Sequence, residues 1–234
     1  MNHLVHIVKS CIDFILPHTC ILCNKETESG LICDTCLDAL PQVRSPFCHR
    51  CGRPLKRRKT CRFCKNGTYL DQGRAWAPFI PPVDALTHFY KYRKMTLLSQ
   101  LIGRGMANVI VSDFFLKQSD VIVPVPLFWW KRLKRGYNQA KLLADVVGDE
   151  CGIEVKHMLR RVKNTKTQTQ LDEESRKKNV SNAFEVTDGM IKDKTVLLID
   201  DVLTTGATVN ECAYVLKNAG AKKVYSCVAA IAPG

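Results

Sequence analysis

The chain has 234 residues, which is enough to bury a substantial core and to form one or two domains. It has 35 Lys and Arg residues against 22 Asp and Glu residues, and the net charge of +13 favours nucleic acids, phosphorylated ligands or anionic surfaces as partners. No apolar run reaches the roughly 18 residues that a membrane-spanning helix requires, so we expect no membrane span.

The first 16 residues carry apolar side chains at helical spacing, interrupted by Lys9 and Asp13. They lack the small-residue cleavage site of an export signal. We therefore expect residues 1–16 to form an amphipathic packing helix and the protein to reside in the reducing cytoplasm. In that compartment clustered cysteines bind metal more often than they form disulfides, and the chain has 12 cysteines.

Eight of the cysteines form four C-x-x-C pairs, and the spacing C-x2-C-x9-C-x2-C occurs twice with an offset of 28 residues. These residues are Cys20, Cys23, Cys33, Cys36, Cys48, Cys51, Cys61 and Cys64. Two intervening residues let both sulfurs of a pair face one ion, and four thiolates favour zinc and leave no position for water. We therefore predict a module over residues 17–72 with two structural Zn2+ sites. The alternative to zinc binding is a redox C-x-x-C motif, which would need one reactive pair near a βαβ unit and not four pairs in tandem.

Pairing the first C-x-x-C with the second, and the third with the fourth, is the simpler assignment because each nine-residue loop then closes locally. A crossed pairing of the first with the third stays open. His49 lies between Cys48 and Cys51 and is an alternative ligand.

The second repeat is strongly basic, because no acidic residue occurs from Ala39 to Leu70. The candidate DNA-binding residues are Arg53, Lys56, Arg57, Arg58 and Lys59. Phe47, Phe63 and Tyr69 supply aromatic rings in the same repeat. Cations beside aromatic rings suit single-stranded nucleic acid, whose phosphates and unstacked bases both find partners. The alternative is an ordinary solvated basic loop.

Residues 71–82 contain one glycine and three prolines, and we expect a turn-rich join there, followed by a second domain over residues 73–234. Residues 84–111 suggest a strand and then a helix, and residues 121–126 read VIVPVP, an apolar strand. Towards the carboxyl end, strands alternate with helices. This alternation predicts an α/β fold with a mostly parallel sheet.

Two polar segments interrupt this pattern. The first is basic, has a turn at Gly136 and precedes a helix that begins at Asn138 or Gln139. The second, residues 160–184, is almost devoid of apolar side chains. Such an insertion in a compact α/β domain is usually a functional lid or a disordered loop, and its arginines suit closure over an anion with exclusion of water.

The most informative stretch is residues 196–209, VLLIDDVLTTGATV. Four apolar residues form a short buried strand that ends on Asp200 and Asp201, and residues 204–208, TTGAT, open an apolar-periodic helix. Backbone N–H groups at the helix start, threonine hydroxyls and a glycine together make an anion cradle. Because the two carboxylates can accept hydrogen bonds from ribose hydroxyls, the stretch suits a ribose 5-phosphate. Ordinary α/β packing is the alternative.

This stretch closely resembles the phosphoribosyl pyrophosphate (PRPP) motif of type I phosphoribosyltransferases, whereas the spacing and the lysine of a Walker P-loop are missing. The resemblance implies a phosphoribosyltransferase-like sheet with helices on both faces. It also implies that Asp200 and Asp201 are catalytic residues and that Mg2+ accompanies PRPP. The PRPP-binding residues that it implies are Asp200, Asp201, Thr204, Thr205, Gly206, Ala207 and Thr208.

The whole chain resembles the ComF (ComFC, GntX-like) family, because the paired C-x-x-C units, PVPL with RGYNQA, and LLIDDV-x-TTGAT occur in family order. The resemblance implies a role in natural competence, the uptake of single-stranded DNA for transformation, alongside other DNA-uptake proteins. It further points to Arg135, Gly136, Asn138, Gln139, Arg161, Gln170, Arg176 and Asn179 without assigning their roles. Candidates for a pyrophosphate or lid loop are Arg135, Gly136, Arg161 and Arg176.

Two functions are therefore carried forward. In the first, the protein is a Mg2+-dependent transferase that displaces pyrophosphate from PRPP. In the second, it handles single-stranded DNA and uses the PRPP site as a ligand sensor or binding cleft. A phosphoribosyltransferase of nucleotide salvage or metabolism, acting on a small base or amine, is the alternative to a role in competence.

Overall fold

The computed structural model describes residues 19–27, 30–56, 60–65, 67–93, 95–163, 180–187 and 191–233. The chain forms two compact units, residues 1–41 and residues 42–234. The packing helix expected over residues 1–16 lies outside the described residues. No helix in the described part of the chain is both long enough and apolar enough to cross a membrane.

The first unit contains the first cysteine repeat, held by short local elements. An antiparallel bridge joins Thr19 to Glu26 across the first C-x-x-C pair. Helix α2, Asp34–Asp38, begins directly after Cys33, so the second pair lies at a helix start. Two tight reversals of the chain therefore bring the four cysteines of this repeat together.

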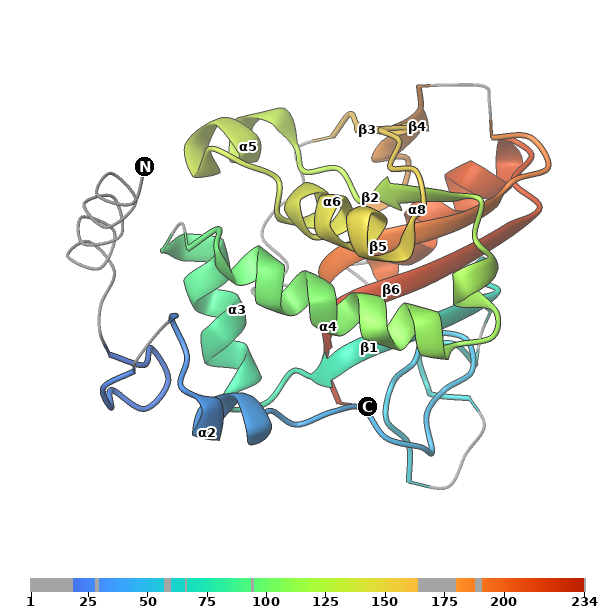
Figure 1. Ribbon diagram of the computed structural model, residues 1–234. Coiled ribbons are helices and arrows are strands. Elements are labelled where there is room, and N and C mark those ends of the chain that lie inside the picture. The colour runs from blue at the N-terminus through green and yellow to red at the C-terminus, as the bar shows by residue number, and fades with distance from the viewer. Residues whose placement is uncertain are drawn as a thin grey trace. The chain divides into compact units, whose positions relative to one another are not determined.

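The second unit is built on a four-stranded parallel sheet with the strand order β1-β6-β5-β2 (Figure 1). The strands are β1 (Gln72–Pro78), β2 (Val121–Pro124), β5 (Thr195–Leu203) and β6 (Lys223–Ile231). The central strand β6 is buried from Val224 to Ile231, which is the pattern of a parallel strand covered on both faces. The predicted α/β fold with a mostly parallel sheet is confirmed.

Helices cover both faces of this sheet and surround its carboxyl end (Figure 1). They are α3 (Val83–Tyr92), α4 (Leu98–Ser112), α5 (Trp129–Arg135), α6 (Gln139–Cys151) and α8 (Ala207–Asn218), with a short 3-10 helix η1 (Leu116–Gln118). α4 packs against α6, over β1 and β6, and α6 packs over β2 and β5. α8 packs on the other face, where Val209 and Cys212 share one core cluster with Val196 and Leu198.

Residues 71–82 are not the expected join, because they contain β1, which pairs in parallel with β6 from Gln72 opposite Tyr225 onwards. Gly73 does not mark a turn. A β-carbon on Gly73 would lie 2.9 Å from the Cα of Cys51, so the glycine permits a close backbone approach. The second cysteine repeat lies in the same compact unit as the sheet, since the two units are residues 1–41 and residues 42–234.

The strand expected at the start of residues 84–111 is also wrong, since this region forms α3 and α4. The buried positions of α3 are Val83, Leu86, Thr87 and Tyr90, which follow the helical period of 3.6 residues. The helix expected to begin at Asn138 or Gln139 is confirmed, because Asn138 caps α6 by accepting a hydrogen bond from the N–H of Ala140 at 3.2 Å.

Strand β5 is longer than predicted, because it continues through the acidic pair and still pairs with β6 at Leu203 opposite Ile231. The polar segment 160–184 begins and ends in a two-stranded antiparallel pair, β3 (Leu159–Arg161) and β4 (Phe184–Val186). The lid candidate Arg176 lies outside the described residues, as do Gln170 and Asn179, to which no role was assigned.

Candidate functional site

The eight predicted cysteines form two groups of four, and each group consists of one sequence repeat. Within each group all the sulfurs lie within 4.8 Å of one another, and two of the contacts are Cys23 Sγ to Cys33 Sγ at 3.7 Å and Cys51 Sγ to Cys61 Sγ at 3.6 Å. Tetrahedral Zn–S bonds of about 2.3 Å place the sulfurs about 3.8 Å apart, so both groups fit zinc. The sequential pairing therefore holds, and His49 is an exposed residue outside the two groups.

Both groups offer sulfur ligands alone, and four of them around one ion would leave no coordination position for water. Each is therefore suited to a structural ion and not to hydrolysis. The second group is the more deeply buried, since Cys48, Cys51 and Cys61 are each less than 5% exposed.

The acidic pair lies near the carboxyl end of β5, and both residues are partly buried. Asp200 Oδ1 accepts a hydrogen bond from the N–H of Asp201 at 2.9 Å. Asp201 Oδ1 accepts one from the N–H of Val202 at 2.6 Å and forms an ion pair with Lys91 Nζ on α3 at 3.2 Å. Burial, with the charge of Asp201 as a second cause, raises the pKa of Asp200 to about 7 although Lys91 and Arg161 oppose the shift.

The TTGAT loop, residues 204–208, connects β5 to α8. Gly206 caps α8 in the left-handed region at φ +85°, a conformation that glycine adopts without strain. Thr205 Oγ1 accepts a hydrogen bond from the N–H of Ala207 at 3.4 Å, and α8 begins at that residue. The amino terminus of a helix of 12 residues thus points at the loop, where its dipole favours a phosphate.

A cavity of about 440 Å³ opens over the acidic pair and the loop. β5 and the loop contribute Asp200, Asp201, Val202, Thr204 and Thr208. The facing walls come from α3, from residues 125–127 after β2, from residues 135–140 and from Arg161. Sequence segments that are far apart in the chain therefore meet at one cavity, as expected for a ligand site at the carboxyl end of a parallel sheet.

Of the candidate pyrophosphate or lid residues, Arg135 and Arg161 line the cavity. Arg135 Nη1 donates to Gln139 Oε1 at 2.7 Å. Gly136 ends α5 in the left-handed region at φ +88° and is exposed. Gln139 is only 2% exposed, and its Nε2 has no hydrogen-bond partner among the described residues. A buried donor without a partner at the cavity wall is a feature that a bound anion would satisfy.

Comparison with known proteins agrees with both parts of this arrangement. Residues 11–65 match the model of the double zinc ribbon domain, and residues 99–233 match that of the phosphoribosyl transferase domain. The chain is 30% identical over 221 residues to Competence protein F of Haemophilus influenzae, covering 88% of this chain and 93% of that protein. The chain belongs to the ComF/YhgH family.

Two further members of the family have a similar sequence identity to this chain. DNA utilization protein YhgH of Salmonella typhimurium is 29% identical over 222 residues, covering 89% of this chain and 95% of that protein. Competence protein ComFC of Bacillus subtilis is 26% identical over 238 residues, covering 86% of this chain and 89% of that protein. The ComF/YhgH architecture of a double zinc ribbon and a phosphoribosyltransferase domain therefore spans nearly the whole sequence.

The structure describes two of the five basic residues expected to bind DNA, Arg53 and Lys56. Lys56 is exposed, and Arg57, Arg58 and Lys59 lie outside the described residues. Arg53 is 0% exposed, so it does not belong to an exposed DNA-binding cluster. Nothing in the sequence indicates this burial, because Arg53 lies among other basic residues and the carbonyls that accept its side-chain hydrogen bonds are more than 150 positions away.

Two of the three aromatic rings expected to stack on bases are already in contact with arginine guanidinium groups. The Arg74 guanidinium lies 4.5 Å from the ring centroid of Phe47, and those of Arg53 and Arg62 lie 4.4 and 4.7 Å from that of Phe63. Tyr69 is 49% exposed, and its ring packs on Tyr214 with centroids 4.8 Å apart. Tyr69 is therefore the ring of this set that is most accessible to a base.

The sequence did not predict that α3 contributes to the 440 Å³ cavity. Asp84, Thr87, His88, Lys91 and Tyr92 line the cavity. The ion pair between Lys91 and Asp201 settles the position of Lys91, which faces the acidic pair.

Proposed function

We propose that the protein binds PRPP with Mg2+ in the 440 Å³ cavity and acts in the handling of single-stranded DNA during DNA uptake. The observation that supports PRPP best is the convergence, on one cavity, of a helix amino terminus, two adjacent carboxylates and an unpartnered buried amide donor. These groups match a phosphate, ribose hydroxyls and a second anionic group, respectively.

In this pose, the TTGAT loop takes the 5-phosphate, and Asp200 and Asp201 accept hydrogen bonds from the ribose hydroxyls. Arg135 and Gln139 face the pyrophosphate from the opposite wall, and Arg161 adds positive charge at the cavity. The carboxylates of Asp200 and Asp201 would hold Mg2+ through its water ligands, and the ion would neutralise charge on the pyrophosphate. Lys91 must then leave Asp201 or share it with the ion.

Transfer would break the bond between ribose C1 and the pyrophosphate oxygen and form a bond from C1 to an acceptor atom. α3 also lines the cavity with Asp84, His88 and Tyr92. These side chains supply a hydrogen-bond acceptor, an imidazole and an aromatic face. They favour a second candidate function, phosphoribosyl transfer to a small base or amine in nucleotide metabolism.

A role with DNA is supported by three features. The net charge is +13, Lys56 is exposed on a repeat that has no acidic residue from Ala39 to Leu70, and the names of the relatives refer to competence and DNA utilization. Phosphate contacts from lysines and arginines bind single strands without sequence preference. The PRPP site then serves either as the catalytic centre or as the ligand sensor of a DNA-handling protein.

Calorimetry with PRPP and Mg2+ tests the site, using wild type and an Asp200→Asn/Asp201→Asn double variant. The double variant is expected to lose at least about a hundredfold in affinity, because amides are poor partners for both hydrated Mg2+ and ribose hydroxyls. Equal affinity in the two proteins would contradict the assignment. Pyrophosphate release from PRPP, measured with and without single-stranded DNA and with small bases or amines, separates the candidate functions.

A further inference from the structure

Arg53 is a fully buried cation whose position is fixed by the second zinc cluster. Its carbonyl accepts the N–H of Cys48 at 2.8 Å, within the turn that the third C-x-x-C pair makes. Its guanidinium lies 4.4 Å from the ring centroid of Phe63, which stands between Cys61 and Cys64 of the fourth pair. Both halves of the metal cluster therefore hold Arg53, one through its backbone and the other through its side chain.

The guanidinium of Arg53 reaches out of the second ribbon, residues 46–70, to the end of the sheet. Nη2 donates to the carbonyl of Thr204 in the TTGAT loop, and Nη1 donates to the carbonyl of Ala232 just after β6. Ala232 N–H in turn donates to Leu203 O at 2.9 Å. The planar fork thus joins the ends of β5 and β6 at the point where the loop begins, a geometry that a lysine cannot reproduce.

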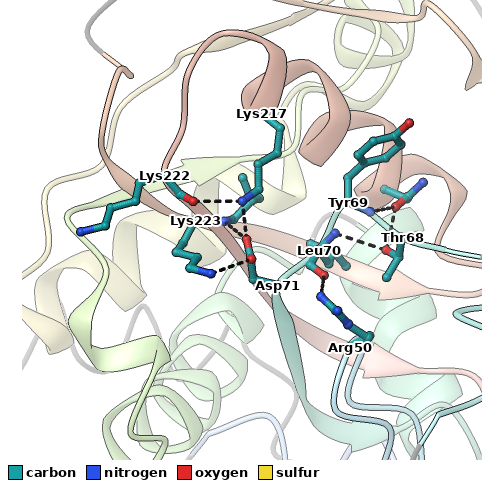
Figure 2. A network of polar contacts seen from close by, with 10 residues as sticks. Arg50, Thr68, Tyr69, Leu70, Asp71, Lys217, Lys222 and Lys223 are labelled. Atoms are coloured by element: carbon teal, nitrogen blue, oxygen red, sulfur yellow. Dashed lines mark hydrogen bonds and ion pairs between the residues drawn. The ribbon is translucent and has the colours of Figure 1, made fainter.

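A second connection links the ribbon to the first turn of α8. Asn210 Oδ1 accepts hydrogen bonds from Thr68 Oγ1 at 2.7 Å and from Tyr69 N–H at 2.8 Å. Figure 2 shows how the segment continues, with Arg50 donating to Leu70 O at 3.1 Å and Asp71 paired with Lys217 at 2.7 Å. The ribbon is therefore attached to both ends of α8.

The TTGAT loop lies between two cavities. Thr204 and Thr208 line the 440 Å³ cavity, whereas Thr205, Gly206 and Ala207 line a smaller one of about 210 Å³. The smaller cavity is closed on its other side by ribbon residues that include Phe63 and Thr68. The loop consequently has the proposed ligand on one side and the zinc ribbon on the other.

We propose that the second zinc ribbon helps to form the PRPP site. In this arrangement Arg53 is a positioning residue, and the hydrogen bond between Thr68 and Asn210 supports it. Zinc fixes Arg53, and Arg53 fixes the carbonyl of Thr204, so that the loop is preorganised for a phosphate. The inference rests on PRPP as the ligand of the larger cavity. Because binding linkage is reciprocal, PRPP should also stabilise zinc in the second cluster and not in the first.

The main test compares Arg53→Met with Arg62→Met, using PRPP calorimetry on zinc-loaded full-length protein. Both variants remove one cation beside Phe63, but Arg62 is exposed and makes no hydrogen bond to the described residues. Arg53→Met should weaken PRPP binding at least about tenfold, whereas Arg62→Met should stay within about twofold of wild type. Arg53→Lys should give an intermediate affinity, because it keeps the charge and one hydrogen bond. Equal affinities for wild type and a folded Arg53→Met would overturn the proposal.

Arg53 is buried, so its substitution can prevent folding. In that case Thr68→Val decides, because it is nearly isosteric and removes only the Thr68 hydroxyl, which donates to Asn210 at 2.7 Å and accepts the N–H of Leu70 at 3.3 Å. An affinity lowered about threefold at unchanged zinc content supports the proposal. An affinity equal to that of wild type refutes it.

Two further readouts separate the inference from the proposed function. Hydrogen exchange at the amides of residues 204–208 needs no ligand, and it should be faster in Arg53→Met than in wild type or Arg62→Met. If wild type binds no PRPP, the proposed function fails, but this difference in exchange still tests the positioning role, and equal exchange rejects it. The second readout is the rate at which zinc is released to a chelator. PRPP with Mg2+ should slow the loss of one of the two zinc ions from wild type, and it should slow the loss of neither ion from Arg53→Met.

Discussion

The two cysteine repeats share a spacing and a knuckle geometry but differ in what surrounds the metal. In both, the N–H of the first cysteine donates to the carbonyl five residues later, at 2.7 Å in the first repeat and 2.8 Å in the second. In both, the residue four positions after that cysteine has positive φ, Asn24 at +58° and Gly52 at +77°. The two knuckles therefore share one backbone geometry along with their ligand spacing.

The residues inside each repeat decide where the knuckle is placed. The position of Arg53 corresponds to Lys25 in the first repeat, and that of Phe63 corresponds to Thr35. Lys25 and Thr35 are both exposed, whereas Arg53 is 0% exposed. The first repeat belongs to the unit of residues 1–41, and the second is packed into the unit that contains the sheet. Within its own unit, the second repeat is adjacent to the proposed PRPP site, because Arg53 and Phe63 lie beside the TTGAT loop.

The largest contrast is expected between Cys20→Ser and Cys61→Ser. Each variant should bind one zinc instead of two, because each removes one ligand of a four-sulfur group. Cys61→Ser should also lower the unfolding midpoint of the sheet unit by about 10 °C, corresponding to about 3 kcal/mol, and abolish PRPP binding. Elemental analysis and calorimetry measure these effects. If Cys20→Ser lowers the same transition equally, the two repeats do not differ as described.

A smaller contrast is expected at two glycines of the second unit. A β-carbon on Gly52 would lie 2.8 Å from the Cα of Arg74 in β1, whereas one on Gly67 would meet nothing within 4 Å, and both glycines have positive φ. Gly52→Ala should therefore cost about 2 kcal/mol more than Gly67→Ala, because only Gly52→Ala pushes the ribbon off the sheet. Urea unfolding of both variants measures the difference, and similar losses would show that the ribbon tolerates displacement.

Binding to single-stranded DNA should also distinguish the repeats. Reversing the charge of Lys56, Arg57, Arg58 and Lys59, with Arg53 left in place, is expected to weaken binding about tenfold and to flatten its salt dependence by roughly 0.7 for each phosphate that is no longer neutralised. PRPP affinity should remain close to that of wild type. Lys25→Glu in the first repeat is the control, and it should leave the salt slope unchanged. A wild-type slope in the charge-reversed protein would assign the basic residues to a solvated loop.

The smallest expected effect is a pH dependence that belongs to the sheet unit. Burial raises the pKa of Asp200 to about 7, so between about pH 4 and 7 the folded state keeps a proton that the unfolded state releases. Stability therefore falls as pH rises through this window, by about 1 kcal/mol between pH 6 and 8. Asp200→Asn should remove this loss, which urea unfolding at the two pH values detects. An identical pH dependence in wild type and variant would contradict the raised pKa.

Features that depend on neighbours in the chain could be predicted from the amino-acid sequence. The cysteine spacing predicted both sulfur groups because each ligand set closes within 17 residues. Residues 196–209 predicted the strand, the acidic pair, the TTGAT loop and the helix that follows, because these parts are consecutive. Local hydrophobic periodicity and metal-ligand geometry act over short distances, so a linear pattern records them.

Features that depend on distant residues emerged from the fold. Residues 72–78 resembled a join until pairing with β6 made them a strand, and Lys91 became a site residue only because α3 lies over the acidic pair. Arg53 shows the limit most clearly, since its hydrogen-bond acceptors Thr204 and Ala232 lie 151 and 179 positions away. Charge and composition describe what a side chain is, whereas its burial and its partners are fixed by packing between segments that the sequence does not place together.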